Sequence, residues 1–228
     1  MKKYPIKSVI LCLVLFFPLL IVLETSKYNI ADSINEIIRF FEKADDKKDW
    51  DTRVIKNDCT RNLVAAAVEQ TTKNVVYDPT YFQIGYPNGD VPSDRGVCTD
   101  VIIRAYRAVG IDLQKEIHED MVKNFDLYPK KWKMTETDTN IDHRRVPNLQ
   151  IFFKRFGEEL EISNNPESYL PGDIVTWNMP SGRPHIGLVS NFNKNGVPLI
   201  IHNIGSGPKI DNALFKFEIS GHYRYFCK

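Results

Sequence analysis

One cysteine and two distant histidines have the residue types and positions of a nucleophilic catalytic centre. Cys98 follows a loop rich in turn-forming residues and precedes a helical pattern, so we expect its thiol at a helix N-terminus. The helix dipole lowers the pKa of a thiol there, and unpaired backbone N–H groups can bind an oxyanion. Such a thiol also needs a base and a group that orients the base. We assign these roles to His185 and His202, with Asn203 as the alternative orienting residue.

The spacing of the two histidines predicts that they share one face of a sheet. His185 and His202 are 17 residues apart, near the ends of two predicted strands. A four-residue loop at 192–195 would place them directly opposite each other. A two-residue turn at Asn195–Gly196 would leave them four positions out of register. An even loop length keeps them on one face in either case, while the register stays open.

The elements that must position these residues change type along the chain. Helical periodicity comes first and strand patterns follow, which favours an α+β domain with an antiparallel sheet. The predicted helices span residues 61–72, 98–109, 116–125 and 146–156. The predicted strands span residues 173–177, 186–192, 197–203 and 222–227.

The N-terminus has the pattern of an export segment. Lys2, Lys3 and Lys7 precede an apolar stretch that ends at Leu23, which is typical of a secretory signal. We expect residues 1–25 to be a signal peptide or an N-terminal membrane anchor, and the protein to meet a membrane only through this segment. Residues 26–55 would be a linker or helical lead-in, and residues 56–228 the catalytic domain, in the periplasm or cell envelope.

The predicted export determines which cysteines are expected to meet oxidising conditions. Cys12 belongs to the apolar segment, which leaves Cys59, Cys98 and Cys227 in a compartment that oxidises thiols. A Cys59–Cys227 disulfide would tie the two ends of the domain together and stabilise it by about 3–5 kcal/mol. The alternative is that both are reduced thiols. In either case Cys98 is the cysteine with chemically suggestive surroundings.

Composition excludes several function classes. Lys and Arg number 30 and Asp and Glu 29, so the balance of charge gives no reason to expect a nucleic-acid partner. The sequence has no closely paired metal-ligand motif such as Cys-x-x-Cys or His-Glu-x-x-His, so we expect neither a metal nor another cofactor. We expect a monomer.

Further residues are candidates for binding a substrate. Asp142-His143-Arg144-Arg145 could present an arginine fork to a carboxylate, or could be a helix cap followed by exposed charges. The substrate-binding candidates are Tyr86, Asp94, Asp100, His143, Arg144, Arg145 and Asn203.

Two sets of motifs resemble known families. Gly-Asp-Ile-Val at 172–175, His-Ile-Gly-Leu-Val at 185–189 and Ile-Ile-His at 200–202 resemble the second half of the NlpC/P60 cell-wall endopeptidases. Gly-Val-Cys-Thr-Asp-Val at 96–101 and Asn-Ile-Asp-His-Arg-Arg-Val-Pro-Asn-Leu at 140–149 resemble the family called domain of unknown function 1287, over most of residues 60–227. The chain departs from the NlpC/P60 pattern at Val97, where an Asp is usual, and at Thr99, where a small Ser or Gly is usual.

The resemblance implies a papain-like fold of the NlpC/P60 type, with N-terminal helices packed on a small antiparallel sheet. It also implies a cysteine hydrolase that cleaves amide or peptide bonds in peptidoglycan, or in another envelope amide, through a thioester on Cys98 with His185 as the base. An acyltransferase on the same residues, or a non-catalytic envelope-binding module on the same fold, are the alternatives.

Overall fold

The computed structural model describes residues 50–133 and 135–225 of the chain, all within one unit that spans Lys48–Lys228. The predicted export segment, most of the lead-in at 26–55 and Cys227 lie outside the described residues. Cys59 is disulfide-bonded; its pairing with Cys227 stays a prediction. Within the described ranges, no helix is both long and apolar enough to cross a membrane.

All four helices predicted within these ranges are present. They are α3 (Asp58–Glu69), α4 (Cys98–Ala108), α5 (Leu113–Asn124) and α6 (Val146–Phe156). Asn57 caps α3 by accepting a hydrogen bond from the Thr60 N–H, and the Asp112 carboxylate caps α5 in the same way. The cap at Asp112 explains why α5 begins earlier than its apolar periodicity indicates. Short 3₁₀ turns occur at η1 (Gln70–Thr72), η2 (Phe125–Leu127), η3 (Lys131–Lys133), η4 (Asp142–Arg144) and η5 (Pro166–Ser168).

The strands form a mostly C-terminal antiparallel sheet, as predicted. Its order is β4-β9-β5-β6-β7-β8, and β1 also pairs with β6. The strands are β1 (Asp51–Thr52), β4 (Glu158–Glu159), β5 (Ile174–Asn178), β6 (Pro184–Lys194), β7 (Val197–Asn203), β8 (Pro208–Asp211) and β9 (Glu218–Arg224). The short strands β1, β4 and β8 lack a strand pattern in the sequence, and the last strand lies closer to the N-terminus than the predicted range 222–227.

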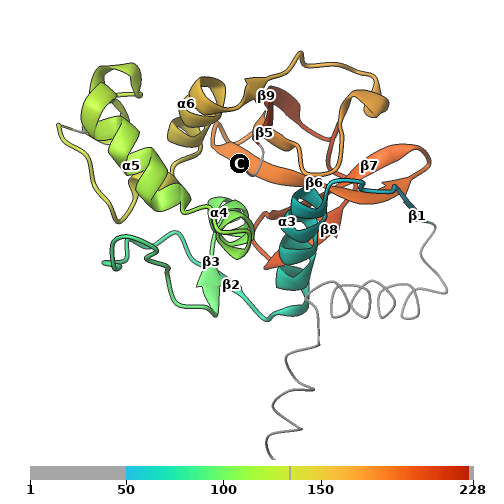
Figure 1. Ribbon diagram of the computed structural model, residues 1–228, viewed down its shortest axis with the longest axis horizontal. Helices are drawn as coiled ribbons and strands as arrows, with labels where there is room; N and C mark the ends of the chain where they lie inside the picture. Colours follow the sequence, from blue (N-terminus) through green and yellow to red (C-terminus); the bar gives the residue numbers. More distant parts are fainter. Residues whose placement is uncertain (1–49, 134, 226–228) are drawn as a thin grey trace, which may run out of the picture. The chain divides into compact units, whose positions relative to one another are not determined.

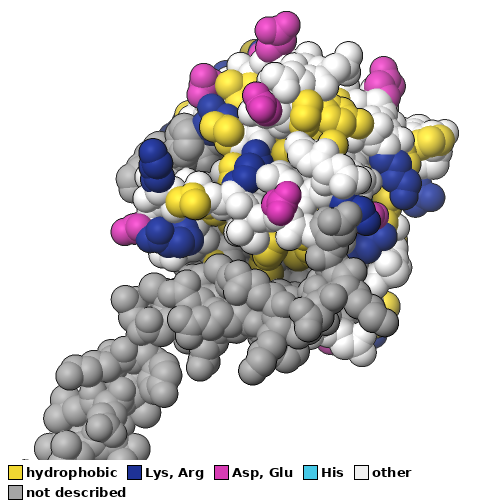
Figure 2. Space-filling view, turned by 90° about the vertical axis from the view of Figure 1, so that its right-hand side faces the viewer, with side chains coloured by type: hydrophobic (Ala, Val, Ile, Leu, Met, Phe, Trp, Pro, Cys, Tyr) yellow, Lys and Arg dark blue, Asp and Glu magenta, His cyan; other side chains and the backbone are white. Residues whose placement is uncertain are grey.

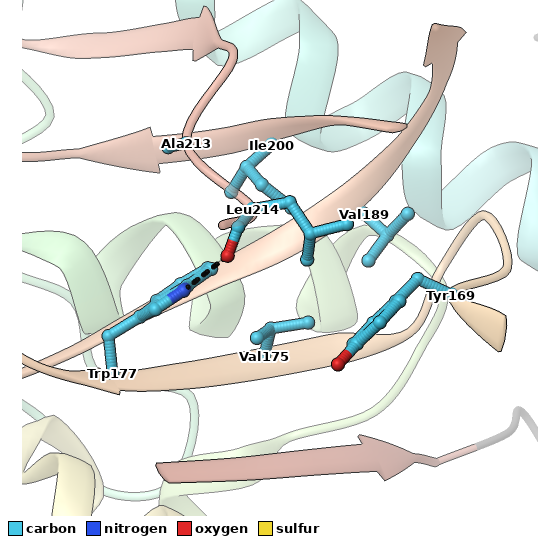
Figure 3. Packing of buried hydrophobic residues seen from close by; sticks show 7 residues of the cluster. All are labelled: Tyr169, Val175, Trp177, Val189, Ile200, Ala213 and Leu214. Atoms are coloured by element: carbon cyan, nitrogen blue, oxygen red, sulfur yellow. Dashed lines mark hydrogen bonds between the residues drawn. The ribbon is translucent and has the colours of Figure 1, made fainter. Parts of the chain in front are cut away.

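Buried apolar side chains cover one face of this sheet. On that face, Val175, Trp177, Val189 and Ile200 pack with Tyr169, Ala213 and Leu214 (Figure 3). The Trp177 indole N–H donates to the Leu214 carbonyl oxygen at 2.9 Å. This bond fixes the segment that connects β8 to β9 over the sheet, because a buried indole N–H needs an acceptor.

Three of the described helices pack against strands of this sheet. Helices α3 and α4 pack together and both contact β6, and α6 contacts β6 and β9 (Figure 1). The Gln150 amide of α6 donates to the Thr176 hydroxyl of β5 at 2.9 Å. A separate parallel pair, β2 (Val76–Tyr77) with β3 (Arg95–Gly96), leads directly into α4. The start of α4 is therefore held between this pair and the sheet.

The surface shown in Figure 2 mixes charges of both signs with apolar side chains. Acidic and basic groups are interspersed over the described part of that face. That part of the face shows no continuous field of one charge sign.

Candidate active site

Cys98 is the first residue of α4, as predicted, and its thiol points toward the sheet. The backbone N–H of Ile186 on β6, directly after His185, lowers the pKa of this thiol. The backbone N–H groups of Cys98 and Thr99 also interact with the thiol. The Asp100 carboxylate accepts the Val97 N–H at 2.7 Å and so caps the helix from within its first turn. Cys98 is thereby held near the backbone of Ile186, the residue that follows the candidate base.

A β-bulge brings the two histidines together. The strands turn at Asn195–Gly196, which by itself would leave the histidines four positions out of register. The register then shifts between Val189 and Asn193, and beyond the bulge Leu188 lies opposite Ile201. The offset is thus reduced to two positions, which is a diagonal pair on one face. The His185 Nε2 and His202 Nδ1 atoms are 2.9 Å apart.

Two small side chains make this arrangement possible. A Cβ on Gly187 would come within 2.5 Å of Ile200 Cγ2 and 3.2 Å of the His202 Cβ, so a larger residue would push His202 away. The Ser190 hydroxyl accepts from the Phe192 N–H and donates to the Leu199 carbonyl, which satisfies backbone groups in the bulge. The predicted shared face is confirmed, and the bulge supplies the register.

Burial controls the protonation of all three groups. Cys98 is 7% exposed, His185 5% and His202 1%. Burial, aided by the nearby Asp100 carboxylate, raises the pKa of Cys98 to about 12, although the surrounding N–H groups oppose the rise. The expectation that the helix dipole would lower this thiol pKa is therefore wrong, because desolvation is the larger effect.

The histidines are neutral for the same reason. Burial, and then the neighbouring His202, lowers the pKa of His185 to about 3. Burial also lowers the pKa of His202 to about 4, against the opposing charge of Asp211. Among residues 50–133 and 135–225 there is no hydrogen bond between the Cys98 thiol and the His185 imidazole. Catalytic hydrogen bonds often tighten only when substrate is bound. The resting site is a neutral thiol beside a neutral imidazole.

Asp100 and Arg144 form a buried ion pair rather than a substrate-binding fork. The guanidinium donates from Nε and Nη2 to both carboxylate oxygens of Asp100, at 2.9 and 3.0 Å, and from Nη1 to the Thr80 carbonyl. Both side chains are at most 3% exposed. We correct the substrate-binding interpretation of these two residues, because the geometry assigns them to holding the start of α4.

The other substrate-binding candidates are dispersed. His143 is buried and its pKa is lowered to about 3 by burial, whereas Arg145 lines a surface pocket of about 390 Å³ and lies over the Trp132 ring. Asp94 is exposed, and Tyr86 packs edge-on against the His118 ring rather than beside Cys98.

The Asn203 side chain binds the segment before Cys98 rather than the His185 ring. Its side-chain amide donates to the Gly96 carbonyl at 3.2 Å, two residues before Cys98, and its oxygen accepts the Gly205 N–H. The orienting contact to the base is made by His202.

Two residues at the site were not found from the sequence. Tyr77 lies beside Gly96 in the β2–β3 pair, and its pKa is raised by burial and by the Cys98 charge. The Arg183 charge lowers the same Tyr77 pKa. A signal for Tyr77 was present: Val75-Val76-Tyr77 is an apolar extended run that can pair with the segment before Cys98. Trp177 flanks His185, with ring centroids 5.8 Å apart.

The described residues contain no group of three or more His, Cys, Asp or Glu side chains arranged to hold a metal ion. The arrangement that they do contain is a thiol, an imidazole and a second imidazole in sequence. These are the groups that nucleophilic attack assisted by a general base requires.

Comparison with known proteins gives one family and several relatives. The family model "Domain of unknown function (DUF1287)" matches residues 64–225. The Escherichia coli (strain K12) protein named "Uncharacterized protein YijF" is 51% identical over 178 residues, which is 77% of this chain and 87% of that protein.

Similar solved structures include NlpC1 from Trichomonas vaginalis, with 18% identity and a TM-score of 0.43; the match covers 78% of this chain but only 48% of that one. An N-acetylmuramoyl-L-alanine amidase from Bacteroides uniformis has 13% identity and a TM-score of 0.48, covering 75% of this chain and 100% of that one. With TM-scores below 0.5, these likenesses carry no inference about activity.

Replacing Arg144 tests the buried ion pair. Arg144→Met leaves the Asp100 carboxylate buried without its cation, so we expect the free energy of unfolding to fall by about 3–5 kcal/mol in urea denaturation. Lys130→Met, which removes the exposed partner of Asp126, is the control and should cost less than about 1 kcal/mol. Equal, small losses in the two variants would show that the pair does not hold the helix start.

The protonation of Cys98 predicts its reactivity toward iodoacetamide. Because the thiolate is the reacting form and burial raises the thiol pKa to about 12, the alkylation rate should rise about tenfold per pH unit from pH 7 to 10. Mapping the adduct by peptide mass spectrometry isolates Cys98 from the other cysteines. The urea-unfolded chain is the control, with a plateau above its ordinary pKa of about 8.5. A plateau below pH 8 in the folded protein would reveal a preformed thiolate–imidazolium pair instead.

Proposed function

The chain belongs to the DUF1287 family, and on that premise we propose that it is an exported cysteine hydrolase that cleaves amide bonds in the peptide part of peptidoglycan. One observation carries the proposal. Cys98 begins a helix, and its thiol pKa is lowered by the N–H of Ile186, the residue after His185, whose Nε2 lies 2.9 Å from the His202 Nδ1. A nucleophile, a base and an orienting group in this order are the parts that acyl transfer requires.

The geometry assigns a role to each ring nitrogen. Nε2 of His185 is committed to His202, so Nδ1 is the atom that accepts the proton of the Cys98 thiol. The sulfur then attacks the amide carbonyl carbon, and the backbone N–H groups of Cys98 and Thr99 stabilise the oxyanion. The imidazolium gives its proton to the leaving amine, which departs as the thioester forms. Water, deprotonated by His185, then attacks the thioester and releases the acid and the free thiol.

The resting site holds the thiol and the imidazole in their neutral forms. Burial lowers the His185 pKa to about 3, so the imidazole is unprotonated throughout pH 5–8. The thiol stays protonated over the same range because its pKa is raised. The active protonation state is therefore the dominant one, and acyl transfer begins with proton transfer rather than with a resting ion pair.

The proposed substrate class rests on the predicted export of the chain, on its motifs and on the residues around Cys98. The basic and apolar N-terminal segment supports export, and the motifs at 172–175, 185–189 and 200–202 resemble those of NlpC/P60 cell-wall endopeptidases. The Cys98 charge acts on the half-buried Tyr77 phenol, and the exposed Arg183 cation acts on the same phenol. A cation there complements the carboxylates of peptidoglycan stem peptides.

Digestion of isolated peptidoglycan tests the proposal. The full chain should release soluble fragments that carry a new amine, identified by liquid chromatography and mass spectrometry. Cys98→Ala should reduce the release by about 10³-fold or more, since loss of a nucleophile removes the covalent route. Asp126→Asn, at a side chain 99% exposed, is the control and should leave the rate unchanged.

Three outcomes separate the alternatives. Fragment release that persists in Cys98→Ala contradicts the nucleophile assignment. Products that incorporate an added amine faster than water identify a transferase on the same residues. Co-sedimentation with peptidoglycan without any new amine, in both wild type and Cys98→Ala, identifies a non-catalytic envelope-binding module and rejects the hydrolase.

A further inference from the structure

The second ring nitrogen of His202 is buried and faces a carboxylate on the next strand. His202 Nε2 has no hydrogen-bond partner within the described part of the chain, and its side chain is 1% exposed. The Oδ2 atom of Asp211 lies 3.7 Å from this nitrogen. The register of β7 with β8 pairs His202 with Lys209 and Ile200 with Asp211, so Asp211 and His202 form a diagonal pair on one face.

We propose that Asp211 is a positioning residue that fixes the tautomers of His202 and His185 and so keeps the His185 Nδ1 lone pair available to Cys98. The inference rests on the proposed function for its catalytic meaning. The tautomers themselves are a property of the folded protein and can be measured without any substrate.

Only one position of the proton on neutral His202 is favourable beside the Asp211 carboxylate. A negative oxygen at 3.7 Å favours a proton on the His202 Nε2 and disfavours a lone pair there. Neutral His202 then has its lone pair on Nδ1, which must accept from the His185 Nε2 across the 2.9 Å contact. His185 is thereby protonated on Nε2, and its Nδ1 is free to act as the base.

The reverse arrangement would disable the site. If His202 carried its proton on Nδ1, it would donate to the His185 Nε2 and would turn an Nε2 lone pair toward the Asp211 carboxylate. Neutral His185 would then carry its proton on Nδ1 and could not accept one from Cys98. Fixing the tautomer of a base is worth a large factor in rate where a carboxylate orients the imidazole directly. Here 3.7 Å is longer than a direct hydrogen bond, so Asp211 acts through its charge.

The neighbouring charges set the strength of this effect. Lys209 Nζ lies 3.1 Å from the Asp211 carboxylate, and the Lys216 charge also acts on both Asp211 and His202. Against these two cations, the Asp211 charge raises the His202 pKa while the Lys209 and Lys216 charges lower it. Removing Asp211 and removing Lys209 should therefore have opposite effects on His202.

Ring-nitrogen ¹⁵N NMR at pH 7 on the full chain tests the proposal. The wild type should show Nε2 protonated and Nδ1 unprotonated in both His185 and His202. Asp211→Leu, which removes the charge and the acceptor, should mix the tautomers of both rings or reverse them. Lys209→Gln is the matched control on the same strand and should keep the wild-type tautomers. Thermal unfolding of each variant checks that the fold is retained.

Turnover gives the second readout. Asp211→Leu should lower kcat on peptidoglycan fragments about tenfold with KM within about twofold, because only the base is affected. Wild-type tautomers retained in a folded Asp211→Leu, or a Nδ1 proton on wild-type His185, would overturn the inference even if Cys98 is the nucleophile. Conversely, a Cys98→Ala variant that still digests peptidoglycan would reject Cys98 as the nucleophile and leave the NMR result standing.

Discussion

The buried ion pair of Asp100 with Arg144 holds the proposed nucleophile, Cys98, in place. Its two hydrogen bonds join the first turn of α4 to η4, and Arg144 also reaches the Thr80 carbonyl in the loop after β2. The Thr99 hydroxyl donates to the Arg144 backbone carbonyl at 3.2 Å, which adds a second tie between the same segments. Because the Asp100 carboxylate also caps the helix at Val97, this charged pair connects the helix start to both neighbouring segments.

The same dry environment that strengthens the pair determines the chemistry beside it. Burial raises the pKa of Cys98 and lowers those of His185 and His202, so each group rests in its neutral form. A site of this kind depends on geometry rather than on a stored thiolate. In the proposed reaction, proton transfer from the thiol has to precede attack, and the base must present the correct ring nitrogen. For this reason the proposed reaction depends on the contact between His185 and His202, and on the Asp211 charge next to His202, as much as on Cys98.

Local patterns predicted the helices, the antiparallel sheet and the common face of the histidines, because these follow from periodicity. The bulge between Val189 and Asn193 was not predictable, since it arises from the packing of Gly187 and Ser190 between strands. The assignment of Arg144 to substrate binding failed for a related reason. An arginine that binds a ligand and one that binds an internal carboxylate have the same sequence signature, and only burial separates them.

The central claim is that Cys98 forms a thioester with the wall peptide. Acid quenching of the full chain with peptidoglycan, from milliseconds to minutes, followed by peptide mass spectrometry, measures this directly. We expect a stem-peptide acyl group on the peptide that contains Cys98, sensitive to hydroxylamine and absent after Cys98→Ala. Wall fragments released at every time point with no acyl group on Cys98, or with the group on another residue, would contradict the claim.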